Sequence, residues 1–227
     1  MAKLIIFGTG VMGDLIAEHF THQSDWDVVA YTSDADYIEG DTHNGRPRVP
    51  FEEITKQYPP DDASMFVALS YGKANANRRS AFLRSKAAGY GFASFVSPHA
   101  RSLAPIVHGE NVFINESIFQ PNAVIGSNVI IWSNNVIGHH ATIGDHCFIS
   151  SGAVISGGVR VHESCFFGVN SACRENIEIA EGSVIGAGTT VLRSTKAHQL
   201  LMAAEPKTLQ LKPGQEDFLV RPAKSAD

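Results

Sequence analysis

An apolar residue recurs at every sixth position through the second half of this 227-residue chain. Stepping by six from Ile125 to Val191 gives twelve positions, and ten of them are Ile or Val. The residue after each is often glycine, and the residue four after each is mostly small or β-branched. A period of six fits neither a helix nor a single extended strand. It is typical of a parallel β-helix, in which each flat face supplies one inward aliphatic residue and small residues allow the chain to turn.

Three such hexads make one triangular coil of 18 residues, so residues 107–192 provide nearly five coils. This segment contains no lysine, a single proline and 11 of the 20 glycines, which sets it apart from the rest of the chain. The alternative is a β-sandwich with accidental spacing. Sandwich strands do not keep one register through twelve steps, so the β-helix is favoured.

The first half alternates predicted strands with predicted helices. Short apolar runs at 3–7, 26–31, 64–69 and 92–96 predict strands. Segments at 11–20, from Pro50 onward, and 73–88 predict helices. The pattern favours a small parallel sheet covered by helices, of the Rossmann-like α/β class. Arginines 78, 79 and 84 lie on the third helix and are expected to form a solvated face.

The change of composition and of residue period along the chain predicts domain boundaries. We expect a Rossmann-like domain at 1–96, a β-helix domain at 97–195 and a C-terminal tail at 196–227. The formal net charge of -5 offers no basic surplus for nucleic acid. No segment approaches the ~18–20 apolar residues that span a bilayer, and the N-terminus does not read as a signal peptide. Three cysteines without a CxxC pair favour a reducing compartment, so a cytoplasmic location is expected.

A glycine-rich turn joins the first predicted strand to the first helix. Gly8-Thr9-Gly10-Val11-Met12-Gly13 satisfies the GxGxxG pattern, whose glycines permit close backbone approach and whose helix N-terminus attracts phosphate. A nicotinamide dinucleotide is disfavoured for two reasons. The second strand ends Ala30-Tyr31-Thr32 without the usual acid, and the unit is too short for a full dinucleotide fold. A tight turn without ligand is the other alternative.

Two adjacent histidines occupy a defined place in the repeat. His139 and His140 follow the inward Ile137 by two and three residues, which puts them at a coil corner. Residues 18 apart stack on neighbouring coils, so Gly157 is expected over His139 and Gly158 over His140. The two glycines would leave an open slot beside the imidazoles, where a backbone N–H could meet a carbonyl oxygen. The alternative is a solvated histidine pair beside turn-forming glycines.

Repeat, glycine-rich turn and histidine segment together resemble a known family. The [Ile/Val]-Gly-x-x-[small]-x repeat is similar to the left-handed β-helix of hexapeptide-repeat acyltransferases. With the GTGVMG turn and the segment 137–144, it resembles the two-domain sugar O-/N-acyltransferases of surface-polysaccharide synthesis, which acetylate sialic acid or nucleotide-linked amino sugars. The resemblance extends to about residue 195. It implies acetyl-CoA as acyl donor, a nucleotide-linked sugar as acceptor, no metal, and a homotrimer with sites between neighbouring β-helices.

The resemblance also implies roles for particular residues. His139 corresponds to the general base, with His140 beside it, and the backbone at Gly157 and Gly158 to the acyl-CoA contact. The nucleotide is expected at the glycine-rich turn and the end of the second strand. Those positions are Gly8, Gly10, Val11, Met12 and Thr32.

The chain departs from the family pattern in three places. His140 stands where Glu or Asp often follows the base. Phe148 stands where some members carry a second histidine, and Ala203-Ala204-Glu205-Pro206-Lys207 replaces a Gly-x-Pro-Ala-Lys turn.

Two other functions stay open on the sequence alone. One is a γ-carbonic-anhydrase-like zinc hydratase, for which His108, His140 and His146 are the available ligands. The other is a non-catalytic β-helix scaffold with a degenerate site, which the missing acidic partner favours. Transfer to an amine and transfer to a hydroxyl need the same base, so the sequence does not separate N- from O-acylation.

Overall fold

The first part of the chain folds into one five-stranded sheet with three helices. The computed structural model describes residues 1–205. The strand order is β3-β4-β2-β1-β5, and only the β3–β4 pair is antiparallel. In that order the strands span Thr42–His43, Arg46–Pro50, Trp26–Ser33, Ala2–Phe7 and Ala63–Val67. The helices are α1 (Val11–Gln23), α2 (Ile54–Gln57) and α3 (Ala76–Ala87), with a 3-10 turn at Ala35–Tyr37.

Helices cover both faces of this sheet, as the sequence predicts. α1 packs on one face through Ile16 and Phe20. α2 and α3 pack on the other face, where Ile54 and Phe82 join the apolar cluster. We call this sheet with its helices the α/β unit. None of the helices described between residues 1 and 205 has the length and apolar character needed to cross a bilayer.

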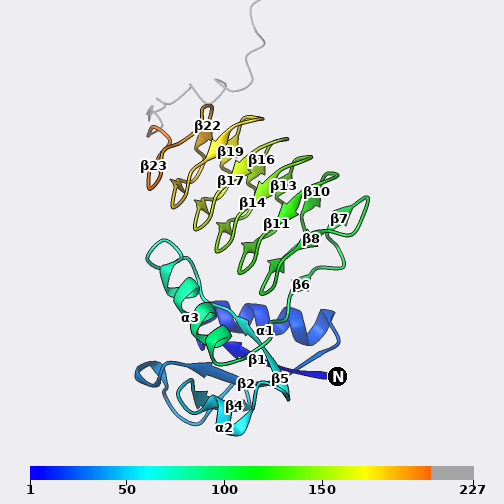
Figure 1. Cartoon of the computed structure of the whole chain (residues 1–227), viewed down its shortest axis with the longest axis vertical. Coiled ribbons are helices and arrows are strands. Elements are labelled where there is room, and N and C mark those ends of the chain that lie inside the picture. Colours follow the sequence, from blue (N-terminus) through cyan, green and yellow to red (C-terminus); the bar gives the residue numbers. More distant parts are fainter. Residues whose placement is uncertain (206–227) are drawn as a thin grey trace, which may run out of the picture.

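The second part is a parallel β-helix with three faces (Figure 1). Each face is a parallel sheet of two-residue strands, and from β10 to β22 neighbouring strands on one face are 18 residues apart, as in the pairing of Val136 with Val154. Near the start of the β-helix the spacing is 17, as in the pairing of Arg101 with Ile118, and the last pair, Val184 with Leu200, is 16 apart. Face 1 contains β7, β10, β13, β16, β19 and β22, at Arg101–Ser102, Ile118–Phe119, Val136–Ile137, Val154–Ile155, Ala172–Cys173 and Thr190–Val191. Face 2 contains β8, β11, β14, β17 and β20, at Val107–His108, Val124–Ile125, Thr142–Ile143, Arg160–Val161 and Glu178–Ile179. Face 3 contains β6, β9, β12, β15, β18, β21 and β23, at Phe95–Val96, Phe113–Ile114, Ile130–Ile131, Phe148–Ile149, Phe166–Phe167, Val184–Ile185 and Leu200–Leu201.

The inward residues are those that the six-residue period selects. All twelve, from Ile125 to Val191, are at most 3% exposed and form one continuous core. The residues four positions later, such as Ala141 and Ala153, are also buried and fill the space between the larger side chains. The period of six therefore identified both the fold and its core.

From residue 119 to residue 188, every corner of the coil uses a left-handed backbone residue three positions after the inward one. Twelve successive corner residues have φ between 54° and 76°: Asn122, Asn128, Asn134, His140, His146, Gly152, Gly158, Ser164, Asn170, Asn176, Gly182 and Gly188. Asn and Gly enter this region most readily, which explains their frequency here.

The glycine that often follows the inward residue does not itself make the turn. That position has another constraint. A Cβ on Gly138 would lie 2.4 Å from the backbone nitrogen of Gly157 on the next coil. Glycine is needed there because two backbones approach closely, and the turn itself is made two residues later.

Two predicted elements of the first half differ in the structure. The fourth strand does not extend the α/β sheet: Phe92 makes one isolated bridge to Met65, whereas β6 pairs with β9 on face 3. Phe95 stacks on Phe113 with ring centroids 5.2 Å apart, so its aromatic packing begins the β-helix. The helix expected from Pro50 is a single turn, α2, because Pro50 ends β4 instead.

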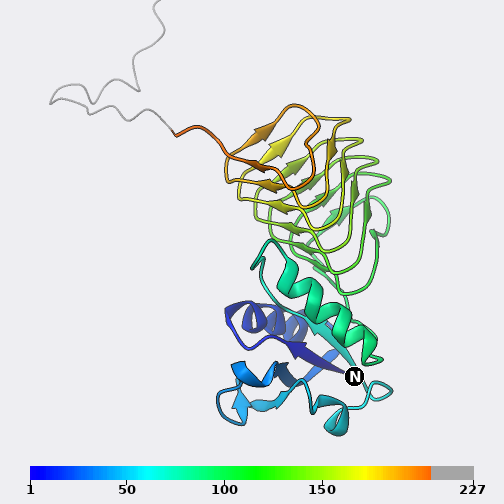
Figure 2. The ribbon, with the colours of Figure 1, turned by 60° about the vertical axis from the view of Figure 1, so that its left-hand side comes forward.

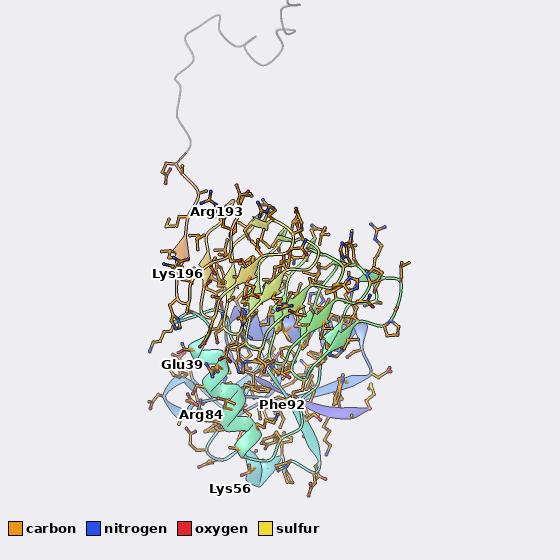
Figure 3. The ribbon with its side chains drawn as sticks, turned by 45° about the horizontal axis from the view of Figure 1, so that its top comes forward. Glu39, Lys56, Arg84, Phe92, Arg193 and Lys196 are labelled. Carbon is orange, nitrogen blue, oxygen red and sulfur yellow. The ribbon has the colours of Figure 1, made fainter. Side chains whose placement is uncertain are left out.

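Face 3 is covered by the α/β unit. Its outward residues Phe113, Ile130 and Phe148 belong to the same buried cluster as Phe20 of α1. The first turn of α3 lies beside the coils (Figure 2). At the other end of the chain, Arg193 and Lys196 lie on the last coils, far from Lys56 of α2 (Figure 3).

Arg78 of α3 joins the two parts and is fully buried, which corrects its expected place on a solvated face. Its guanidinium donates to the backbone oxygens of Asn128, His146 (2.9 Å) and Cys147 (3.1 Å), and to Oδ1 of Asn75 (2.9 Å). Burial lowers the pKa of Arg78 to about 10, which still leaves it charged at neutral pH. An arginine that satisfies three carbonyls on two coils fixes α3 against the β-helix.

Candidate active site

His139 and His140 lie at the corner between β13 on face 1 and β14 on face 2. Ile137 before them and Ala141 after them are fully buried, which fixes the corner from both sides. Both histidine side chains are exposed. The N–H of His139 donates to Oε1 of Gln120 (3.0 Å), and that of His140 donates to the oxygen of Pro121 (3.1 Å) on the preceding coil. The structure thus places the predicted pair at a rigid corner, available to solvent.

Gly157 lies directly over the imidazole of His139, in the register that the 18-residue coil predicts. A Cβ on Gly157 would lie 2.5 Å from Nε2 and 2.6 Å from Cε1 of His139. The N–H of Gly158 donates to the oxygen of His139 (2.8 Å). The expected open slot is therefore filled by the imidazole itself. Only glycine leaves room for the ring, with Nε2 held against the next coil.

The backbone N–H of Gly157 is a donor without an acceptor in the part of the chain that the structure describes. It belongs to the residue that stacks on the imidazole of His139, because a Cβ on Gly157 would lie 2.5 Å from Nε2. A base and a free N–H at one point are the two groups that acyl transfer from a thioester requires.

His140 has a different place from its neighbour. Its φ of 56° makes it one of the left-handed corner residues. Nδ1 of His140 lies 3.2 Å from Nδ1 of His139, and its Nε2 lies 3.0 Å from Nδ2 of Asn122 on the preceding coil. The two rings are nearly perpendicular, at 82°. His140 thus contacts the nitrogen of His139 that points away from Gly157.

The other histidines proposed as zinc ligands are scattered. His146 lies at the next corner, between faces 2 and 3, and is 6% exposed. Burial, aided by Arg79, lowers its pKa to about 4, and its Nδ1 accepts from Nδ2 of Asn128 (2.8 Å). His108 bonds its own neighbouring carbonyl. Among residues 1–205, no three His, Cys, Asp or Glu side chains gather as a metal-binding group.

The glycine-rich turn of the α/β unit is tightly packed. Gly8 has φ of +132°, and its N–H donates to the oxygen of Thr32 (2.8 Å). A Cβ on Gly13 would lie 2.1 Å from the oxygen of Gly8, so the glycines let α1 start close against β1. Gly10 precedes the first residue of α1 and is exposed, with no side chain capping the helix. The N–H groups of the first turn of α1 are therefore free for an anion.

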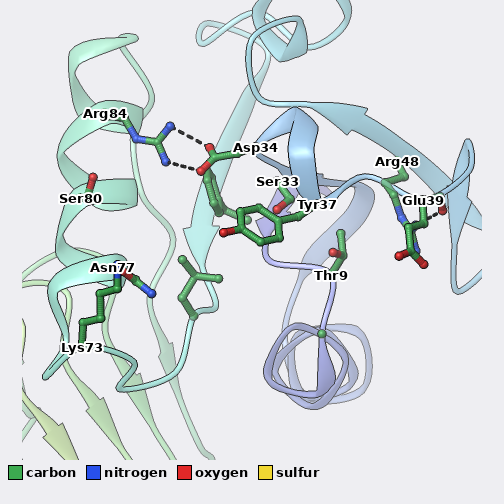
Figure 4. A pocket seen from close by; sticks show the side chains of 13 residues that line it. Thr9, Ser33, Asp34, Tyr37, Glu39, Arg48, Lys73, Asn77, Ser80 and Arg84 are labelled. Atoms are coloured by element: carbon green, nitrogen blue, oxygen red, sulfur yellow. Dashed lines mark hydrogen bonds and ion pairs between the residues drawn. The ribbon is translucent and has the colours of Figure 1, made fainter.

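A cavity of about 650 Å³ opens beside this turn (Figure 4). Of the five predicted nucleotide-binding residues, only Gly10 lines it. Val11 and Met12 line a neighbouring hollow of about 400 Å³ with Gly10. Gly8 and Thr32 are buried beneath the turn. The structure thus places one of the five predicted residues at the cavity and two more at the hollow next to it.

Sequence reasoning missed the polar residues that line the cavity. Asp34 and Arg84 form a bidentate ion pair at 2.7 and 3.1 Å on one wall, and Tyr37 lies next to them (Figure 4). Arg48 and Lys73 add positive charge. These residues come from four separate segments, so no local motif could have assembled them.

Hydrogen bonds hold the guanidinium of Arg48, and a constrained backbone places Lys73 at the cavity. Arg48 donates to the backbone oxygen of Glu39 and to Nδ1 of His43 (2.7 Å), whose Nε2 in turn donates to Asp14 (2.5 Å). Lys73 begins a run of three left-handed residues, Lys73 to Asn75, with φ of 52°, 50° and 69°. Such residues cost about 1–2 kcal/mol each and persist where the surrounding structure imposes them. Here the amide of Asn75, bonded to Ser164 and Cys165 of the coils, holds the turn.

A family model matches part of the β-helix. The model, described as bacterial transferase hexapeptide (six repeats), matches residues 122–157. The matched segment includes both His139 and Gly157. A comparison with curated proteins gave no match.

Solved structures share the fold over nearly the whole chain. The acetyltransferase domain of PglB from Neisseria gonorrhoeae FA1090 has a TM-score of 0.78 at 22% identity, covering 92% of this chain and 100% of that chain. PerB from Caulobacter crescentus, in complex with CoA and GDP-perosamine, has 0.78 at 22% identity, covering 89% and 95%. WeeI from Acinetobacter baumannii AYE has 0.75 at 18% identity, covering 89% and 97%. The similarities confirm the expected fold, a small α/β unit followed by a left-handed parallel β-helix of hexapeptide repeats.

Proposed function

We propose that this protein transfers the acetyl group of acetyl-CoA to an amino group of a nucleotide-linked sugar, in the synthesis of a surface glycan. The observation that carries the proposal is the imidazole of His139 held over Gly157, beside a free backbone N–H. The similar structures support the substrate class, because one is described with acetyl-CoA and another with CoA and GDP-perosamine. Cys147, Cys165 and Cys173 are buried free thiols, which suits a reducing compartment, so the proposed location is the cytoplasm.

The chemistry at the corner follows from the two groups. The acceptor nitrogen attacks the thioester carbon, and His139 takes its proton at Nε2. The negative charge that develops on the carbonyl oxygen is stabilised by the N–H of Gly157. When the carbon–sulfur bond breaks, the proton passes from His139 to the CoA thiolate. The backbone of Gly157 and Gly158 is the proposed contact for the acyl end of the coenzyme.

The nucleotide is proposed to bind in the cavity of the α/β unit. The N-terminus of α1 at Gly10, with Lys73 and Arg48, offers positive charge to a diphosphate. The Asp34–Arg84 pair is internally neutral and suits hydroxyl and ring atoms of the nucleoside. In this proposal, residues 1–96 bind the acceptor, and residues 97–195 bind acetyl-CoA and catalyse the acetyl transfer.

One chain places these two sites on different sides of the β-helix. Face 3 is covered by the α/β unit, whereas His139 lies at the opposite corner, between faces 1 and 2. An acceptor held by one α/β unit therefore has to reach His139 of another copy. On face 1 the outward residues beside this corner are apolar: Ile118 and Val154 are each 39% exposed, and Val136 lies between them. We propose that this face packs against a neighbouring β-helix in a closed homotrimer.

The function is tested by acetyl transfer. Purified protein is incubated with acetyl-CoA and a panel of nucleotide-linked sugars that carry an amine, only hydroxyls, or neither at the acceptor carbon. We expect thiol release with an amino sugar alone, at a rate proportional to enzyme concentration. Release with the hydroxyl sugars alone would change the product to an ester. No release with any member of the panel would contradict a transferase function.

The shared site predicts that two inactive variants restore each other. In His139→Ala the base is lost, and in Lys73→Glu the cavity repels phosphate, so each homotrimer should be nearly inactive. Subunits mixed at equal amounts, unfolded and reassembled, should regain up to about a quarter of wild-type activity, because one site in four then pairs an intact base with an intact cavity. Sedimentation gives the oligomeric state. A mixture no more active than its two components would contradict a site shared between subunits.

A further inference from the structure

A hydrogen-bonded chain of three side chains ends on the proposed base. Asn122 contacts Nε2 of His140 through its amide nitrogen (3.0 Å), and Nδ1 of His140 contacts Nδ1 of His139 (3.2 Å). Nε2 of His139, at the far end, lies against Gly157. The two histidines are consecutive in sequence, and Asn122 lies one coil below, paired with them by the 18-residue register.

Each bond in this chain fixes the next proton. With the amide nitrogen of Asn122 donating, Nε2 of His140 is an acceptor, so a neutral His140 carries its proton on Nδ1. That proton is donated to Nδ1 of His139, which therefore carries its own proton on Nε2. If the amide of Asn122 rotates to present its oxygen, every bond reverses. His139 then holds its proton on Nδ1, and its Nε2 has a free lone pair over Gly157.

We propose that Asn122 is a positioning residue that sets, through His140, which nitrogen of His139 carries the proton. An amide serves both protonation states of the base by rotating. The amide of Asn122 donates to Nε2 of His140 while His139 presents Nε2–H. It accepts from Nε2–H of His140 when Nε2 of His139 has to take a proton. A carboxylate accepts only. This inference adds a residue to the transferase function proposed above, because the direct acidic neighbour of the base is absent and Asn122 acts from another coil.

The side chains of Asn122 and His140 are the main polar groups that act on His139, because the other residues around it carry no charge. The coil below contributes Gln120 and Pro121, and the coil above contributes Ser156, Gly157 and Gly158, none of them ionisable. Arg174 and Glu175 stand at the same corner two coils above the histidines. Among residues 1–205, neither of those two charges takes part in an ion pair.

The first test reads the tautomer without any substrate. Long-range proton–nitrogen NMR of the histidine rings distinguishes a protonated Nδ1 from a protonated Nε2. We expect Asn122→Asp to move the His139 proton from Nε2 to Nδ1, because the carboxylate can only accept. Asn122 has φ of 65°, a conformation that Asp also adopts, so the turn is kept. Asn170→Asp, at a corner with φ of 54° away from the histidines, is the matched control.

The second test reads catalysis as a function of pH, and it rests on the proposed function. A negative charge at 122 favours the protonated histidine pair, so the acid limb of the kcat/KM profile should move to higher pH in Asn122→Asp and stay in place in Asn170→Asp. Asn122→Gly keeps the left-handed turn but removes the hydrogen bond to His140, and kcat should fall about 10-fold. Identical ring-nitrogen shifts of His139 in wild type and Asn122→Asp would overturn the proposal. Failure of acetyl transfer alone would leave the NMR result standing.

Discussion

Replacing His139 by alanine should lower kcat for acetyl transfer by about 10²- to 10⁴-fold, the usual contribution of a general base. Nε2 of His139 is held over Gly157, next to a free backbone N–H on the coil above. Removing the imidazole leaves that donor and the CoA contact in place, so binding of acetyl-CoA should change little. The measurement is thiol release at saturating substrates, with KM for acetyl-CoA determined in parallel.

The control for this variant is another exposed histidine of the same β-helix. His162 lies on face 2, with its side chain 51% exposed, and pairs weakly with Glu178 at 3.7 Å. His162→Ala should keep wild-type kcat, and both variants should unfold at the wild-type temperature because neither side chain is in the core. A His139→Ala enzyme as fast as wild type would show that another group removes the proton.

Replacing Arg78 by leucine should destabilise the protein by about 3–5 kcal/mol, the usual cost of leaving buried partners of a charged group unsatisfied. The guanidinium is fully buried and bonds three backbone oxygens of the β-helix and the amide of Asn75. Leucine fills part of the volume but donates nothing, so the oxygens of Asn128 and His146 lose their donor, and that of Cys147 keeps only the N–H of Ile130. The midpoint of thermal unfolding, followed by circular dichroism, should fall by roughly 10 °C or more.

The adjacent arginine provides the comparison for stability. Arg79 pairs with Glu163 at 3.7 Å with its side chain 42% exposed, so Arg79→Leu should cost less than about 1 kcal/mol. Arg78→Lys keeps the charge but loses most of the bonds and should lie between the two, which gives a measurable variant if Arg78→Leu fails to accumulate. Equal effects of Arg78→Leu and Arg79→Leu would contradict the structural role of the buried guanidinium.

The sequence predicted the β-helix and the relation of His139 to Gly157 because both depend on a local period. Once six residues make a face, a residue 18 further along has to lie on the next coil. His140 was predicted at the corner beside the base, but its left-handed backbone was not, although a signal existed: from residue 119 onward, Asn, Gly, Ser or His recurs three positions after each inward residue. Those residue types tolerate a left-handed backbone, so the pattern marks the corners directly.

The contacts between the two halves could not be predicted in this way. Arg78 has the composition of a solvated helix face and becomes buried only because α3 docks on the coils, which depends on tertiary packing. Arg48 and Lys73 reach the cavity from a strand and a loop that are distant in sequence. The domain boundaries, the nucleotide-binding residues and the trimer stay predictions. Residues 206–227, most of the expected tail, lie outside the described part of the chain, as do Pro206 and Lys207 of the variant closing turn.

The left-handed corners limit how this chain can change in length. From Asn122 to Gly188 each corner residue stands three positions after an inward one, and the coils around His139 repeat after 18 residues. Deleting one residue between His139 and Gly157 would shift the two residues out of the 18-residue register and move Gly157 away from the imidazole. The β-helix accommodates a shorter step near its start, because β9 and β10 begin five residues apart and the later coils still repeat after 18 residues. A change of length between His139 and Gly157 is different, because even a whole added coil would separate the two residues.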